Sequence, residues 1–172
     1  VPGELEATTN PDLNGFLDMT PEDMVASVNF NLLPFMHISQ EMAKFMIENS
    51  QDSQSITGIG SINDMGPYGL PAYSGSKGGM VSFAKEIANE LGPEHRIKVN
   101  VVAPGSTETP LTRKEGMDFD AVDQSTMLRR HNMPEDVAAE VFYLATSKGI
   151  TGQRRVVDNG QAGAADNSRY KK

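Results

Sequence analysis

Helical and strand-like patterns alternate along this chain, and the alternation limits the possible folds more than any other feature. In chain order, the six segments are residues 20–48, 55–61, 73–91, 97–102, 134–147 and 154–157. The second, fourth and sixth are short and strand-like, whereas the others place apolar residues at helical spacing. Because a helix separates each strand from the next, the strands can pair in parallel with helices on both faces of the sheet. We therefore predict an α/β fold in a single domain, residues 1–172.

Prolines and caps set the expected helix boundaries. Thr20 is a typical N-cap and Pro21 suits the first helical position, so the first helix should begin there. Pro34 has no backbone N–H, which predicts a short helix followed by a longer one rather than one straight rod. Gly92 and Pro93 are expected to end the helix that precedes them.

The remaining segments are polar and rich in turn-forming residues. We expect residues 1–19 and 62–72 to be loops, and residues 163–172 to be a frayed tail. Residues 106–133 form a long polar segment that follows a strand. Long segments in that position are often lids or binding loops.

Composition and charge exclude several classes of function. None of the 172 residues is a cysteine, so neither a disulfide framework nor a thiolate metal site can form. The net charge is -8 and the basic residues form no long run, which argues against nucleic acid and anionic membranes as partners. No stretch approaches the ~20 apolar residues of a membrane span. We expect a cytoplasmic protein that holds no metal and acts on a small molecule.

Tyr73 and Lys77 are the first candidates for chemistry. Their spacing of four residues places them on one face of the predicted helix. A phenol titrates near pH ~10, and its pKa must fall by roughly 2–3 units before it can act as an acid/base near neutral pH. A lysine ammonium one turn away favours the phenolate. Ser61, at the end of the preceding strand, could hydrogen-bond the same substrate oxygen as the tyrosine.

Several further motifs accompany this pair in a fixed order and spacing. They are SVNF (27–30), GS (60–61), AYSGSKGG (72–79), VNVVAPGSTET (99–109), MPEDV (133–137), GITGQ (149–153) and VVDNGQ (156–161). With these motifs, residues 20–162 resemble the short-chain dehydrogenase/reductase family. The resemblance implies an oxidoreductase that interconverts a ketone and a secondary alcohol with NAD or NADP.

The resemblance also implies a role for each catalytic residue. Tyr73 would be the general acid/base, and Lys77 would lower its pKa and bind the nicotinamide ribose. Ser61 would position and polarise the substrate oxygen. Asn29 would sit at a break in its helix and hold a water that links Lys77 to solvent.

Four residues after the second strand are assigned to the cofactor by the same resemblance. Pro104 and Gly105 would line the nicotinamide pocket. Thr107 by its backbone and Thr109 by its side chain would contact the carboxamide or the pyrophosphate.

The sequence departs from the family pattern in three places. The family's Rossmann-like, doubly wound parallel sheet begins with a strand and a glycine-rich turn that bind the pyrophosphate at a helix N-terminus. This sequence has no such turn, so we expect it to match the C-terminal two-thirds of a member, without the N-terminal glycine-rich βα units. Asn159 stands where glycine is usual, and Arg154 and Arg155 make the last strand unusually charged.

The expected substrate is a small polar carbonyl compound such as a keto sugar acid, with a 3-ketoacyl thioester as the alternative. Residues 2–9 and 61–63 resemble sugar-acid reductases such as fructuronate (mannonate) reductase-like members, which would let Thr8, Thr9 and Asn63 face a polyhydroxylated substrate. A keto sugar acid would also suit the cations of the long polar segment, which are Arg113, Lys114, Arg129 and Arg130.

The resemblance finally predicts association between copies of the chain. In the family, two long helices pair between subunits, here residues 35–48 and 73–91, which predicts a homo-oligomer, either a dimer or a tetramer. A sheet without its first strands would also expose an unpaired edge. An alternative interpretation is therefore a truncated, catalytically inactive half that acts only in assembly.

Overall fold

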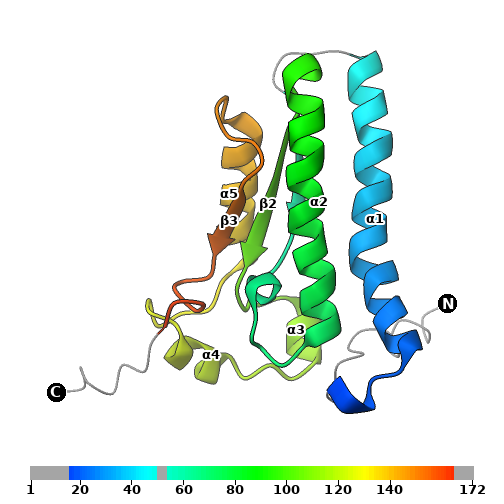
Figure 1. Ribbon diagram of the computed structural model, residues 1–172. Helices are drawn as coiled ribbons and strands as arrows, with labels where there is room; N and C mark the ends of the chain where they lie inside the picture. The colour runs from blue at the N-terminus through cyan, green and yellow to red at the C-terminus, as the bar shows by residue number, and fades with distance from the viewer. Residues whose placement is uncertain (1–15, 50–53, 165–172) are drawn as a thin grey trace.

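The computed structural model describes residues 16–49 and 54–164, and Figure 1 shows their arrangement. A parallel sheet of three strands lies between two layers of helices, in the order β1 (Ser55–Ile59), β2 (Lys98–Pro104), β3 (Arg154–Val157). Helices α1 (Pro21–Glu48) and α2 (Pro71–His95) lie on one side of the sheet, and α5 (Pro134–Thr146) lies on the other. The predicted α/β fold with helices on both faces is confirmed.

The central strand, β2, is the most buried element of the described chain, with every residue from Lys98 to Ala103 buried. Val99 and Val101 pack with three buried residues of α2, Met80, Ala84 and Ala88. Residues 98–102 of β2 pair in parallel with β1, and residues 101–104 pair in parallel with β3, so the faces of the three strands are in register. Side chains therefore alternate between the α2 side and the α5 side of the sheet.

The predicted break in the first helix at Pro34 is wrong, because α1 runs continuously over its 28 residues. Proline removes one backbone hydrogen bond from a helix and leaves the carbonyl four residues earlier without its donor. Pro34 and Phe30 are both exposed, so water can satisfy that carbonyl. The cost of the proline is thereby reduced, and the helix continues.

The predicted end of α2 at Gly92 and Pro93 is also wrong. The helix continues to His95 and ends where Arg96 adopts a left-handed conformation, with φ 55°, and donates its N–H to the Gly92 carbonyl at 3.0 Å. Pro93 is exposed and lies in the last turn, where few intrahelical bonds remain to be lost.

Short helices interrupt the segments expected to be loops. They are η1 (Phe16–Asp18), η2 (Ile62–Met65), α3 (Pro110–Lys114) and α4 (Phe119–Ser125). The ends of the long polar segment are joined by a parallel bridge between Thr107 and Asn132. Residues 1–15, which include Thr8 and Thr9, and residues 165–172 of the expected tail lie outside the described residues.

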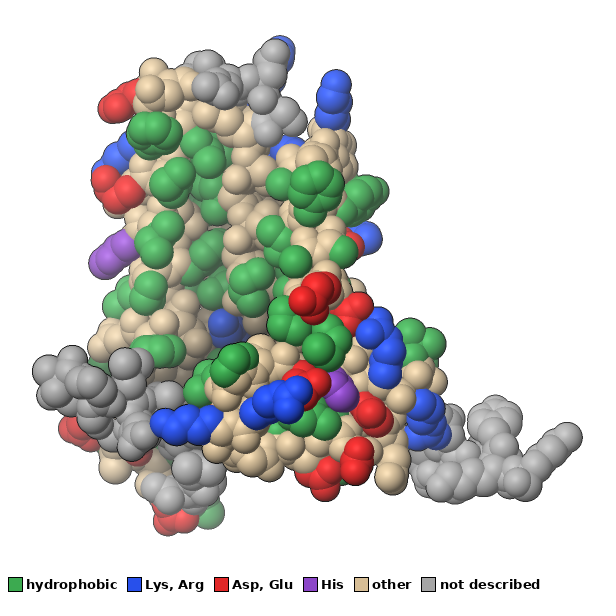
Figure 2. All heavy atoms as spheres, turned by 180° about the vertical axis from the view of Figure 1, so that it is seen from behind, with side chains coloured by type: hydrophobic (Ala, Val, Ile, Leu, Met, Phe, Trp, Pro, Cys, Tyr) green, Lys and Arg blue, Asp and Glu red, His purple; other side chains and the backbone are tan. Residues whose placement is uncertain are grey.

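The opposite side of the molecule, seen in Figure 2, exposes many apolar side chains. They gather along the α1 side and the middle of this view, whereas charged side chains are concentrated in its lower part. Helix α1 alone exposes Val25, Phe30, Ile38, Met42 and Phe45. Within the ranges 16–49 and 54–164, no helix has the length and apolarity needed to cross a membrane.

Candidate active site

The carboxyl ends of the three strands meet at one edge of the sheet, and the predicted site residues follow them. Ser61 comes two residues after β1, and Gly105 comes directly after β2. In open α/β sheets, ligands bind in the crevice at this edge. The topology thus brings segments far apart in sequence to one place.

Ser61 leaves the sheet through a tight turn at Gly60. The Gly60 N–H donates to the Val102 carbonyl at 2.7 Å, and a Cβ on Gly60 would lie 2.7 Å from Val101 Cγ1. Ser61 then caps η2, where its Oγ accepts the Asn63 N–H at 3.2 Å and lies 3.3 Å from Asn63 Oδ1. The structure therefore brings Ser61 and the predicted substrate residue Asn63 together.

Tyr73 and Lys77 lie on consecutive turns at the start of α2, which begins with Pro71 at its first position. Both side chains are half-buried. Lys77 Nζ donates to the Ile59 carbonyl at the end of β1, at 3.0 Å, and lies 5.6 Å from the centroid of the Tyr73 ring. The first strand and α2 thus fix the lysine from two sides.

The surroundings of Tyr73 favour the neutral phenol in this structure. Burial raises the pKa of Tyr73, the hydrogen bond with Ser61 opposes that rise, and the Asp64 carboxylate adds to it. Burial lowers the pKa of Lys77. The lowering of the Tyr73 pKa by Lys77 therefore stays a prediction.

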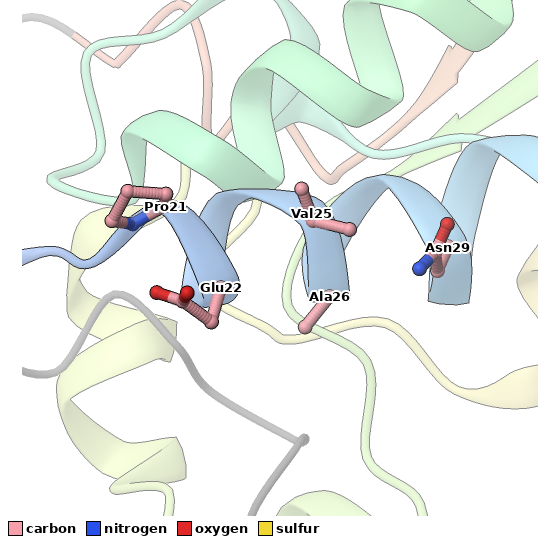
Figure 3. Close-up of a pocket in the computed structure, with 5 residues that line it drawn as sticks. All are labelled: Pro21, Glu22, Val25, Ala26 and Asn29. Carbon is pink, nitrogen blue, oxygen red and sulfur yellow. The ribbon is translucent and has the colours of Figure 1, made fainter.

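Asn29 lies on α1 and not among these residues. The helix is regular at this position, so the break expected there is not found. Ser27 is the buried residue of this turn, and its Oγ lies 3.5 Å from Ser76 Oγ on α2. Asn29 instead lines an open groove of about 310 Å³ along one side of α1, with Pro21, Glu22, Val25 and Ala26 (Figure 3).

The residues after β2 form a compact turn. Gly105 donates its N–H to the Val157 carbonyl at 2.9 Å, and a Cβ there would lie 2.6 Å from Gln161 Oε1, so a side chain would not fit. Thr107 Oγ1 donates to the Gly105 carbonyl at 3.0 Å. Thr109 caps α3 by accepting the Thr112 N–H at 3.2 Å.

Sequence reasoning missed the partner of Arg154. Its guanidinium binds both carboxylate oxygens of Asp64, with Nε 2.9 Å from Oδ1 and 2.7 Å from Oδ2. The Asp64 side chain is 1% exposed and that of Arg154 is 19% exposed. A charged residue in a predicted strand was the signal that a buried counter-ion existed, but the 90 residues between the two gave no clue to its identity.

Sequence reasoning also missed a cluster within the long polar segment. His131 lies between two carboxylates, with Nε2 2.9 Å from Glu108 and Nδ1 2.8 Å from Asp123. The Phe119 ring lies beside the imidazole, with 4.7 Å between centroids and the two planes tilted by 47°. The hydrogen bond with Glu108, and then Asp123, raises the pKa of His131. We call Glu108, Asp123 and His131 the histidine clasp.

The asparagine that replaces the usual glycine at position 159 has a simple geometric basis. Asn159 adopts a left-handed conformation with φ 52°, which glycine adopts without strain and asparagine tolerates. Its side-chain amide also donates to Asn132 Oδ1 at 2.6 Å.

Known proteins resemble this chain in sequence. A family model described as enoyl-(acyl carrier protein) reductase matches residues 7–162. Carbonyl reductase family member 4 of Xenopus laevis is 36% identical over 140 residues, and the human 3-oxoacyl-(acyl-carrier-protein) reductase is 37% identical over 140. Both matches cover 81% of this chain and 57% of the relative. Acetoacetyl-CoA reductase of Acinetobacter is 34% identical over 149 residues, which are 84% of this chain and 59% of that protein.

Solved structures agree with these relatives. Acetoin dehydrogenase from Enterobacter cloacae superposes with a TM-score of 0.78 at 28% identity, over 88% of this chain and 60% of that one. A 4-hydroxyisoleucine dehydrogenase complexed with NADH and succinate gives 0.73 at 26% identity, over 84% and 61%. The predicted Rossmann-like arrangement is confirmed, and the chain spans about 57% of the length of the curated relatives described above. Together with the motifs at the sheet edge, these matches show that the chain belongs to the short-chain dehydrogenase/reductase family.

Proposed function

We propose that the protein to which this sequence belongs is an NAD- or NADP-dependent oxidoreductase that interconverts a ketone and a secondary alcohol. The observation that carries the proposal is the convergence of Ser61, Tyr73 and Lys77 at the carboxyl edge of the sheet. Ser61 hydrogen-bonds Tyr73, and Lys77 is fixed one turn away by the Ile59 carbonyl. These are the groups that a proton transfer to a carbonyl oxygen requires.

In this reaction, Ser61 donates a hydrogen bond to the substrate oxygen and orients it. Tyr73 gives its hydroxyl proton to that oxygen in reduction and takes it back in oxidation. Lys77 stabilises the phenolate that is left after reduction. Its fixed position supports this role, because the ammonium is held near the ring without a conformational change.

The residues present fit the nicotinamide end of the cofactor. The Lys77 ammonium and the Tyr73 hydroxyl are half-buried donors that suit the hydroxyls of a ribose. The turn at Pro104 and Gly105 would border the ring, and Thr107 and Thr109 would contact the carboxamide or the pyrophosphate. The bound cofactor would supply or accept the hydride. A water held by Asn29 that links Lys77 to solvent stays a prediction, because Asn29 lines a groove along α1 that Lys77 does not line.

Replacing Tyr73 by phenylalanine tests the proposal. Tyr73→Phe should lower kcat by about a hundredfold or more, because general acid–base catalysis contributes about 10²–10⁴-fold. Tyr143→Phe, at an exposed position of α5, is the matched control and should leave kcat unchanged. The measurement is steady-state carbonyl reduction by the complete protein, and equal turnover in the two variants would disprove the assignment.

For the substrate, we propose a 3-ketoacyl thioester in preference to a keto sugar acid. The names of the human and Acinetobacter relatives support the thioester. The cations that suggested an anionic substrate already have partners, since Arg113 pairs with Glu108 and Arg130 with Asp136. Acetoacetyl-CoA should therefore give a higher kcat/KM than fructuronate, and the reverse order would favour the sugar acid.

We also propose that the protein associates through α1 and α2 into a homo-oligomer. The apolar side chains that α1 exposes, including Ile38, Met42 and Phe45, support this. The interpretation as an inactive assembling half draws on the same surface and on the edge of β1, which pairs with no further strand within the described ranges 16–49 and 54–164. Titration of the complete protein with NADH and NADPH separates the two, because an inactive half would bind neither.

A further inference from the structure

The ion pair between Arg154 and Asp64 joins the sheet to the turn that carries the candidate catalytic serine. Arg154 stands on β3 opposite Val101, on the side of the sheet that α2 covers. Its guanidinium contacts the Asp64 carboxylate through both Nε and Nη2. A bidentate contact of this kind fixes orientation as well as distance.

Asp64 belongs to the same short turn as Ser61. The Asp64 N–H donates to the Ser61 carbonyl at 3.2 Å, within η2. On the other side, a Cβ on Gly78 would lie 3.4 Å from the Asp64 carbonyl, so η2 packs closely on α2 one residue after Lys77. A shift of the Asp64 carboxylate would therefore move Ser61 relative to Tyr73.

We propose that Arg154 and Asp64 are a positioning pair for the reaction, in which Arg154 anchors the Ser61 turn and neutralises a carboxylate buried near Tyr73. The expected effect of the pair on turnover rests on the proposed function, whereas its expected effect on the pKa of Tyr73 does not. Neither residue touches the reacting atoms, and both act through Ser61 and Tyr73.

Charge balance explains why an arginine is needed. Lys77, on the same helix, lies 5.6 Å from the Tyr73 ring, and the Asp64 carboxylate of η2 acts on the Tyr73 phenol. Arg154 of β3 binds that carboxylate. Asp64 raises the pKa of Tyr73, because a nearby carboxylate opposes the phenolate. Burial raises the pKa of Tyr68, Asp158 and Asp64 add to this rise, and Arg154 opposes it. Loss of Arg154 would leave the Asp64 carboxylate without its counter-ion.

Titration of the tyrosine hydroxyls by NMR in the full chain tests the pair without any assay of activity. With ¹³C-labelled tyrosine, the Tyr73 signal is assigned by its loss in Tyr73→Phe. We expect the Tyr73 pKa to rise in Arg154→Met and to return to the wild-type value or below it in the double variant Asp64→Asn/Arg154→Met. Arg155→Met, the neighbouring arginine on the opposite face, is the matched control and should leave the pKa unchanged.

Two results would overturn the inference: an unchanged Tyr73 pKa in Arg154→Met, or a raised one in the double variant. If Arg154→Met does not fold, the Tyr73 pKa of the double variant still tests the inference, because the double variant removes both charges of the pair and leaves no unpaired carboxylate at position 64. In the complete protein, Arg154→Met should lower kcat by roughly ten- to a hundredfold with little change in KM, as expected for a misplaced catalytic group. If Tyr73→Phe retained turnover, the proposed function would be wrong, but the NMR titration would still test the effect of Arg154 and Asp64 on the Tyr73 pKa.

Discussion

Arg154 and Arg155 are adjacent on β3, but their side chains leave the sheet on opposite faces. Arg154 meets Asp64 beneath α2, where the carboxylate is buried and 19% of the arginine side chain is exposed. Arg155 meets Glu140 of α5, with Nε 2.8 Å from the carboxylate and 47% of the arginine side chain exposed. The same residue type thus forms a desolvated contact on one face and a solvated contact on the other.

The difference follows from what covers each face. On the α2 side, two long helices and η2 exclude water from the sheet. On the α5 side, a single helix of 13 residues covers the sheet and leaves 47% of the Arg155 side chain exposed. Lys98 anchors that helix by donating to the carbonyls of Leu144, Ala145 and Ser147 near its C-terminus. The residues expected to carry the chemistry are attached to the better covered face.

Removing Arg154 should have the largest effect on stability. Arg154→Met leaves the Asp64 carboxylate buried without a counter-ion, which should cost about 3–5 kcal/mol of unfolding free energy. The double variant Asp64→Asn/Arg154→Met should recover most of this loss, because a neutral pair carries no desolvated charge. Urea unfolding of the three proteins measures both quantities. A double variant as unstable as the single one would show that packing by the arginine, not charge, stabilises this face.

The histidine clasp is partly exposed, with 20% of the His131 side chain and 33% of the Asp123 side chain accessible, so its effect on stability should be smaller. The effect should also depend on pH, because an imidazole titrates. The carboxylates raise the pKa of His131 above its usual value near ~6.5. A raised pKa in the folded state means that the clasp contributes fully below the unfolded-state pKa and that the contribution is lost as pH rises through the folded-state pKa.

A substitution at His131 measures this contribution. His131→Asn should destabilise the protein by about 1 kcal/mol near pH 6 and by progressively less at higher pH. Urea unfolding of the wild type and the variant from pH 6 to pH 9 gives the difference directly. A difference that stays flat or grows with pH would mean that the imidazole is held as a neutral ring.

The two arginines also show what sequence could and could not predict. The meeting of Ser61, Tyr73 and Gly105 at one edge of the sheet could be predicted, because the alternation of β and α patterns determines where the carboxyl ends of the strands lie. Arg154 stood out only as a charge in a strand, since a contact across 90 residues leaves no local pattern. The helix break predicted at Pro34 was wrong for the opposite reason. The rule that proline interrupts a helix is local, whereas the exposure that lets water satisfy the freed carbonyl depends on the fold. Exposure and long-range pairing are properties of the folded chain.

Removing Arg155 should have the smallest effect and completes the comparison. Its pair with Glu140 is partly solvated, so water replaces most of the interaction when the arginine is lost, and Arg155→Met should change the unfolding free energy by less than about 1 kcal/mol. Added salt should reduce even that difference, because exposed charges are screened, whereas the effect of Arg154→Met should persist. Urea unfolding at low and high ionic strength measures both. A large, salt-resistant loss in Arg155→Met would mean that the α5 face is as dry as the α2 face, and that coverage by helices does not explain the difference between the two arginines.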